Sequence, residues 1–320
     1  MVRHGGSLAG SQWRKLGRVT LPSDAPTWCT PHAYCPTPVV LSPDTIRVYC
    51  AFIGPDGIGR VGFVDVETEN PTRVTAVSKT PCLDLGAPGR FDEHGVTPVS
   101  IVRNPWDGHL MLYYAGWQRG VGVRYFLFAG LATSEDGVSF TRASECPILE
   151  RCPGESLIRT SPMVRADANG FRMWYSAGNE WVVGTDGVSR PRYSLHEAHS
   201  DDGYLWATPG VPCFLDTGDA TAVGRACVRP LPSGDWEMWF SYRVDGGAYR
   251  MGHGRSPNGI EWSRDGDTCV VPPGSPGEWD SDSVALGTAL ETSAGVYMFY
   301  NGNGLGTTGF GIARLDGNDD

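Results

Sequence analysis

Acidic and imidazole side chains recur in this sequence just before a series of strand-like segments, most of which contain a proline. His32 lies in PHAYCPTP, Asp92 in FDEHGVTP and Glu155 in GESLIRTSP, and a later segment, EWDSDSV, contributes Asp282. A carboxylic acid near other carboxylates has a raised pKa and can act as a general acid, and an imidazole can act as a general base. The four residues predict an acid–base site, provided that the fold brings them together. The alternative is structural, because such side chains can also cap strands and bind turn amides.

The same segments and their flanks supply groups that could hold a substrate. Arginine binds a carboxylate or phosphate through two parallel hydrogen bonds, and tryptophan offers a flat apolar face on which a sugar ring can stack. Each tryptophan also has a structural interpretation as a core residue. The candidate substrate-binding residues are His94, Trp117, Arg159, Trp181, Arg225, Arg229, Arg243 and Asn301.

An internal repeat predicts the elements that position these residues. The phrases IRVYCAF, LMLYYAG, RMWYSAG, EMWFSYR and VYMFYNG recur about sixty residues apart. A strand-like stretch precedes each phrase, and three copies end in a turn of the form S-x-D/N-G, which suits a tight reversal of the chain. Each repeat therefore predicts about four short antiparallel strands. We expect the shared aromatic column to be core: Tyr49, Tyr113, Tyr175, Phe240 and Tyr300.

One such sheet cannot bury both of its faces, whereas five sheets arranged radially can. The sequence therefore predicts an all-β chain that forms a single five-bladed β-propeller of four-stranded antiparallel blades. Innermost strands of a propeller begin around one mouth of the central channel, so the acid–base candidates are expected to approach a shared cavity. The expected blades are 22–80, 81–148, 149–214, 215–272 and 273–316, with 1–21 closing the last blade and 317–320 as a tail.

Composition restricts the partners. The formal net charge is −10, from 26 basic and 36 acidic residues, which argues against nucleic acid or an anionic membrane surface as a partner. No apolar run has the length of a membrane span or the pattern of a signal peptide. The nine cysteines form no CxxC pair, so we expect free thiols in a cytoplasmic protein. In LHEAHS, His196 and Glu197 point to opposite faces of a strand, and we expect neither a metal nor another cofactor.

The ordered phrases HAYCPTPVVL, GRFDEHGVTPVSIV, LYYAGW, GLATSEDGVSF, WDSD and YNGNGLGTTGFG resemble the glycosidase-like five-bladed β-propeller superfamily. This group includes the family 43 glycoside hydrolases and the fructosidases. The likeness spans about residues 11–315 and is greatest to a branch assigned to polysaccharide or secondary-metabolite pathways. The resemblance implies three acids on the first three blades. Asp92 matches the acid that tunes the pKa and Glu155 matches the general acid, whereas His32 stands where the first aspartate is expected.

Three functions stay open at this point. The first is a glycosidase or glycoside phosphorylase that acts on a small glycoside or sugar conjugate, with Glu155 as the acid. The second is a cofactor-free dehydratase or cyclase of bacterial specialised metabolism, in which His32 abstracts a proton and Glu155 or Asp92 protonates a leaving hydroxyl. The third is a non-catalytic sugar-binding propeller. Glycoside hydrolysis normally needs two carboxylates that flank the bond, so the histidine in place of the first acid bears directly on this choice.

Overall fold

The computed structural model describes residues 12–316, apart from 168, 216–217, 245–246 and 267–269. This part of the chain is all-β, as predicted, with twenty-one strands and one four-residue helix, α1 (Asn303–Gly306). Within the described residues, no helix is long and apolar enough to cross a membrane.

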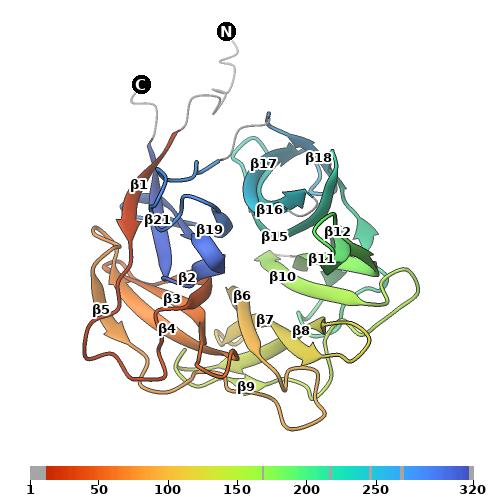
Figure 1. Ribbon diagram of the computed structural model, residues 1–320, viewed down its shortest axis with the longest axis horizontal. Helices are drawn as coiled ribbons and strands as arrows, with labels where there is room; N and C mark the ends of the chain where they lie inside the picture. Colours follow the sequence, from red (N-terminus) through yellow and green to blue (C-terminus); the bar gives the residue numbers. More distant parts are fainter. Residues whose placement is uncertain (1–11, 168, 216–217, 245–246, 267–269, 317–320) are drawn as a thin grey trace.

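The strands form successive antiparallel groups arranged around a common centre (Figure 1). Hydrogen bonds between parallel strands join the second, third and fourth of these groups into one sheet of thirteen strands. The first group comprises β2 (Ala33–Ser42), β3 (Thr45–Ile53), β4 (Gly59–Glu67) and β5 (Val74–Val77). The second comprises β6 (Val96–Arg103), β7 (Leu110–Arg119), β8 (Tyr125–Ser134) and β9 (Thr141–Arg142). The third comprises β10 (Ile158–Asp167), β11 (Gly170–Val183), β12 (Ser189–Ser200) and β13 (Val211–Pro212).

The remaining groups bring the two ends of the described chain together. One comprises β15 (Ala220–Pro230), β16 (Trp236–Val244), β17 (Arg250–Ser256) and β18 (Glu261–Arg264), with β14 (Phe214–Leu215) parallel to β18. The other comprises β19 (Ala285–Thr292), β20 (Gly295–Asn301), β21 (Phe310–Asp316) and β1 (Gln12–Arg18), which pairs with β21. The innermost strands β2, β6, β10, β15 and β19 surround the centre, and each contacts the next, with β19 also against β2 (Figure 1).

The turns predicted from the S-x-D/N-G pattern link neighbouring groups. In the first turn, the hydroxyl of Ser134 accepts a hydrogen bond from the amide of Gly137 at 2.9 Å, and Gly137 has a φ of 69°. The carbonyl of Gly137 accepts a second hydrogen bond, from the hydroxyl of Tyr49 in β3, at 2.6 Å. Equivalent bonds join Tyr113 to Gly203 and Trp174 to Gly259. The repeated turn therefore ties three of these groups to the group that precedes each of them.

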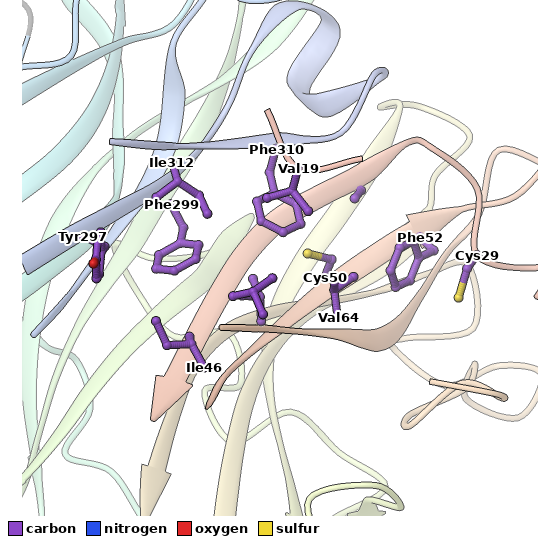
Figure 2. Packing of buried hydrophobic residues seen from close by; sticks show 13 residues of the cluster. Val19, Cys29, Ile46, Cys50, Phe52, Val64, Tyr297, Phe299, Phe310 and Ile312 are labelled. Carbon is purple, nitrogen blue, oxygen red and sulfur yellow. The ribbon is translucent and has the colours of Figure 1, made fainter. Parts of the chain in front are cut away.

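Apolar side chains fill the spaces between adjacent groups. Between the first and last groups, Phe52 of β3 is 1% exposed, and Phe299 of β20 and Ile312 of β21 are fully buried in the same cluster (Figure 2). Each sheet thus buries its faces against its neighbours, which is the physical reason for the radial arrangement. The aromatic column is confirmed as core, since none of its members is more than 1% exposed: Tyr49, Tyr113, Tyr175, Phe240 and Tyr300.

Candidate functional site

The innermost strands are interrupted by β-bulges that face the centre of the molecule. In β10, for example, the pairing with β11 shifts between Thr160 and Met163. A bulge reverses the side-chain alternation locally and re-aims a residue. The residues that the bulges turn toward the centre are Cys35, Val99, Ser161, Arg225 and Leu286, on β2, β6, β10, β15 and β19 in turn.

Backbone strain is concentrated at the same place. In the described chain, all five non-glycine residues with positive φ line one central cavity. A non-glycine residue in the left-handed region costs about 1–3 kcal/mol, and such residues gather at ligand sites. These five residues are Cys35 (φ 55°), Ser161 (φ 54°), Arg225 (φ 50°), Leu286 (φ 58°) and Leu305 (φ 55°).

The central cavity has a volume of about 170 Å³. Hydroxyl groups, aromatic rings and two arginines make up its polar wall. Among the described residues that line it there is no Asp, Glu or His. The polar and aromatic lining residues are Tyr34, Thr97, Trp117, Tyr125, Thr160, Ser161, Ser176, Tyr193, Arg225, Ser241, Arg243 and Tyr249.

Aromatic rings form one side of the central cavity. The rings of Trp117 and Tyr125 meet edge to face with centroids 5.1 Å apart, and the indole N–H of Trp117 donates to the hydroxyl of Thr97 at 3.0 Å. Trp181 packs on Tyr125 at the same centroid distance of 5.1 Å, from outside the lining. This side of the cavity offers a broad apolar face with few rotatable bonds.

Arg225 ties the innermost strands together at the centre. It is 4% exposed and donates to the carbonyls of Pro98 and Pro36 at 3.0 and 3.1 Å. It also donates to the hydroxyls of Thr37 and Thr288 at 2.9 and 3.1 Å. All four acceptors are neutral, so the guanidinium is hydrogen-bonded but its charge is not balanced by an acid.

Several polar groups of the central cavity have no protein partner. The hydroxyls of Thr160 and Ser176 are buried without a hydrogen bond, and the two residues are 4% and 1% exposed. The Nε of Arg243 is likewise buried and unpartnered. Buried polar groups in native proteins are nearly always hydrogen-bonded, so such groups in a cavity wall point to water or a ligand as the missing partner.

Gly224 keeps this part of the wall open. A Cβ at this position would lie 2.3 Å from the hydroxyl oxygen of Ser176 and 3.2 Å from the ring of Tyr193. The hydroxyl of Tyr193 is 2.6 Å from that of Tyr249, whose ring lies 5.0 Å from the guanidinium carbon of Arg243. A chain of contacts therefore runs from Ser176 to Arg243 along one side of the cavity.

Glu155 lies outside the central cavity, in a buried ion-pair cluster. It is 2% exposed and contacts Arg159 at 2.6 Å, Tyr175 at 2.8 Å and His196 at 3.0 Å. Burial alone would raise the pKa of this carboxyl, but hydrogen bonds from His196 and Tyr175 and the charge of Arg159 outweigh it and lower the pKa to about 2. The shift is opposite to the one that a general acid needs, because Glu155 is ionised at neutral pH.

Asp92 belongs to a similar cluster. It is fully buried and accepts hydrogen bonds from Tyr114 at 2.9 Å and from Arg142 at 2.7 Å. In the last group, Asp280 accepts from Tyr300 at 3.0 Å and from Lys15 at 2.6 Å. The phased acids therefore share one arrangement, in which a carboxylate ahead of the innermost strand binds a tyrosine of the next strand and a cation.

The other predicted residues are dispersed around the centre. His32 is half-buried and lies near the backbone of Leu305, a cavity-lining residue, and burial lowers its pKa. Asp282 is exposed. The side chain of His94 accepts a hydrogen bond from the amide of Arg119 at 3.3 Å, outside the lining.

Two further candidates have structural contacts. Asn301 is fully buried and fixes the bulge of β2, because its side chain accepts from the amide of Cys35 at 2.8 Å and donates to the carbonyl of Ala33 at 2.8 Å. Arg229 pairs with Glu237 and lies over the ring of Trp239.

Of the twelve predicted site residues, the structure brings Trp117, Arg225 and Arg243 together on the cavity wall. Sequence reasoning missed the hydroxyl groups of Thr160, Ser176, Tyr193 and Tyr249. A signal for the right region was present, since Cys35, Val99 and Ser161 are each adjacent to a proline of an innermost strand. The prediction instead took positions six or seven residues before a proline of the strand, which in the first strand is Pro38 and not the Pro36 next to Cys35.

A larger hollow of about 350 Å³ lies beside the Glu155 cluster, with His196, Tyr193 and Arg192 among its lining residues. Tyr193 thus contributes to both spaces. Across the described residues, no group of three or more His, Cys, Asp and Glu is arranged to hold a metal ion.

The structural neighbours are glycoside hydrolase-like propeller enzymes. A glycoside hydrolase superposes with a TM-score of 0.71 at 18% identity over 96% of this chain and 92% of its own. A structure from work on the GH130 family of mannoside phosphorylases and hydrolases gives 0.69 at 13% identity over 99% and 97%. An N-acetylgalactosamine deacetylase from F. plautii, in complex with blood group B trisaccharide, gives 0.61 at 15% identity over 90% and 85%. At these identities the likeness shows a propeller fold.

No family model matches the sequence. Two proteins of Mycobacterium tuberculosis are similar over almost their whole length. MT1551 of strain CDC 1551 is 35% identical over 308 residues, which is 95% of this chain and 99% of the relative. Rv1502 of strain H37Rv is 34% identical over 309 residues, again 95% and 99%. The chain therefore belongs to the same protein family as MT1551 and Rv1502.

Proposed function

We propose that the chain is a glycosidase-like propeller protein that binds a saccharide in its central cavity. The observation that carries this proposal is the pair of buried, unpartnered hydroxyls of Thr160 and Ser176 in the wall of a cavity that also holds Trp117 and Tyr125. Sugars combine hydroxyl groups, which donate and accept hydrogen bonds, with apolar C–H faces, which stack on aromatic rings. The F. plautii neighbour, in complex with a trisaccharide, supports the same class of ligand.

We propose that the protein binds a saccharide but does not hydrolyse it by the mechanism that uses two carboxylates. Glycosidases of the ordinary type place two carboxyl groups about 5–9.5 Å apart on either side of the bond. The described lining of the central cavity offers no carboxyl group. Both acids on which the hydrolytic hypothesis relied, Asp92 and Glu155, are occupied by a tyrosine and a cation. This arrangement favours the sugar-binding hypothesis.

An acid–base enzyme is the second candidate, and His32 is the residue that favours it. Burial lowers the pKa of His32, so its imidazole is neutral and able to accept a proton at pH 7. The backbone of Leu305, which lines the central cavity, lies near this imidazole, and this supports a role for His32 at that cavity. In this version His32 abstracts a proton from a ligand held at the centre, as in the dehydratase or cyclase hypothesis.

The fold proposal is a single five-bladed propeller in which each antiparallel group is one blade and β1 completes the last. The contacts around the ring of innermost strands and the pairing of β1 with β21 support it. Blade boundaries are proposed near 22–80, 81–148, 149–214, 215–272 and 273–316.

The test of the proposed function is a binding screen with a panel of mono- and oligosaccharides, followed by titration of the hits. Trp117→Ala removes part of the cavity wall and should weaken binding at least tenfold. Trp106→Ala is the matched control, because Trp106 is 63% exposed and outside the lining, and it should bind as the wild type does. A reducing-sugar assay on each hit should detect no hydrolysis. Equal losses in both variants, or no saccharide bound by the wild type, would contradict the proposal.

A further inference from the structure

The charge of the central cavity differs in sign from that of the whole chain. The formal net charge of the protein is −10, yet the charged residues in the described lining of this cavity are two arginines, Arg225 and Arg243. A cavity lined by one sign of charge and enclosed by low-dielectric walls concentrates ligands of the opposite sign.

Neither cavity arginine has an ion-pair partner among the described residues. Arg225 is bonded to neutral carbonyls and hydroxyls, and Arg243 lies over the ring of Tyr249 with its Nε buried and unpartnered. Elsewhere the partly buried Arg165 donates to the carbonyl of Val228 with no ion pair among the described residues, whereas five other guanidinium groups are neutralised by carboxylates. The pairs are Arg47–Asp65, Arg142–Asp92, Arg159–Glu155, Arg172–Glu197 and Arg229–Glu237. The central cavity lacks the negative charge that neutralises the arginine at each of these paired sites. An uncompensated buried charge is unfavourable, so a bound anion would be stabilised there.

Two hydroxyl groups complete the arrangement. Thr160 and Ser176 lie directly opposite each other in the pairing of β10 with β11, which places their side chains on the same face of the sheet. Both hydroxyls are buried and unpartnered in the wall that also contains Arg243. An oxyanion such as a carboxylate or phosphate accepts hydrogen bonds from a guanidinium and from hydroxyls at the same time.

We propose that the saccharide bound in the central cavity carries an oxyanion, a carboxylate or a phosphate, that is held by Arg243 together with Thr160 and Ser176. This inference rests on the proposed saccharide site and specifies its ligand class. Arg225 adds positive potential from the centre of the ring, while its own hydrogen bonds keep it fixed to the surrounding strands.

The test is calorimetric titration with glucose, galactose and mannose, each as the neutral sugar, the uronate and the 6-phosphate. The wild type should bind at least one anionic form tenfold or more tightly than its neutral parent, and added salt should weaken that binding. Arg243→Met should abolish the preference for the anion but keep the weaker binding of the neutral sugar. Arg243→Lys keeps the positive charge but lacks the planar guanidinium group that donates two parallel hydrogen bonds. It should therefore retain part of the preference for the anionic sugar. Arg14→Met is the control, because Arg14 is exposed and pairs with Asp316 outside the cavity.

The outcomes distinguish a failure of the proposed anion from a failure of the proposed saccharide site. Uronate binding without 6-phosphate binding identifies a carboxylate, and the reverse identifies a phosphate; both support the inference. Equal affinity for neutral and anionic sugars contradicts the proposed anion and is consistent with the proposed saccharide site. Tight binding of inorganic phosphate with no binding of any sugar overturns the saccharide site. The same conclusion follows if no member of the panel binds. Thermal unfolding of each variant shows whether it is folded. If Arg243→Met is misfolded, Arg243→Lys decides the question. An undiminished preference of Arg243→Lys for the anionic sugar would overturn the assignment to Arg243.

Discussion

Glu155→Gln should destabilise the protein strongly, although glutamine has nearly the same shape as glutamate. The carboxylate is 2% exposed and lies 2.6 Å from the Arg159 guanidinium, which is itself 1% exposed. The carboxylate also accepts hydrogen bonds from Tyr175 and from the amide of Gly210. An amide leaves the arginine buried without a counter-ion and turns one acceptor into a donor that faces other donors.

Two independent routes give a similar magnitude for this loss. Removing one partner of a buried ion pair costs about 3–5 kcal/mol. The pKa of Glu155 falls from 4.5 to about 2 on folding, a change of roughly 2.5 pH units that corresponds to about 3 kcal/mol of stability at neutral pH. Because the folded-state pKa is depressed, this contribution is complete above the unfolded pKa and is lost as the pH falls from about 4.5 to 2.

Urea unfolding at pH 7, followed by tryptophan fluorescence, should show a loss of about 3 kcal/mol or more in Glu155→Gln. The difference between wild type and variant should shrink as the pH is lowered toward 3. Glu180→Gln is the matched control, because its ion pair with Arg192 is about half exposed on both sides and such pairs contribute little. A Glu155→Gln protein as stable as this control at pH 7 would refute the ion-pair account and return Glu155 to the list of catalytic candidates.

The remaining predictions concern the cavity wall, the second acid and the thiols. Gly224→Ala forces the Ser176 hydroxyl to move and should weaken saccharide binding tenfold or more; unchanged affinity in a titration would contradict the close approach. Asp92→Asn leaves the partly buried Arg142 without its counter-ion and should lower the unfolding midpoint without changing ligand affinity. Native thiol labelling at pH 8 should modify exposed Cys146 first, and faster labelling of the buried thiols would contradict their burial. Burial raises the pKa of three of the buried thiols, those of Cys29, Cys82 and Cys213, to about 12.

The architecture was predictable because it is encoded locally and repeatedly. The aromatic column and the S-x-D/N-G turns recur in phase, and the structure shows why both are needed, since Tyr49 and Tyr113 each bind the turn of the following group. Eight described cysteines are free, Cys269 lies outside the described residues, and a reducing cytoplasmic location stays a prediction.

The candidate site was harder to predict because its lining depends on where the alternation of side chains breaks. A bulge shifts the register by one residue, and neither periodicity nor residue type marks the position of that shift. Cys35 and Ser161 therefore face the centre, although regular alternation gives no reason to choose them. The phased acids lie outside the central cavity for a related reason. Asp92 and Glu155 turn to the tyrosines of the adjacent strand, about twenty residues on in the sequence, and not to one another.

A crystal structure with a bound saccharide from the binding screen would locate the ligand in the molecule. We expect a sugar in the central cavity, packed against Trp117, with oxygen atoms within hydrogen-bonding distance of Ser176 and Arg243. A sugar bound instead in the hollow beside His196, with the central cavity free of it, would rule out the central cavity as the saccharide site. It would move the functional site to the Glu155 cluster.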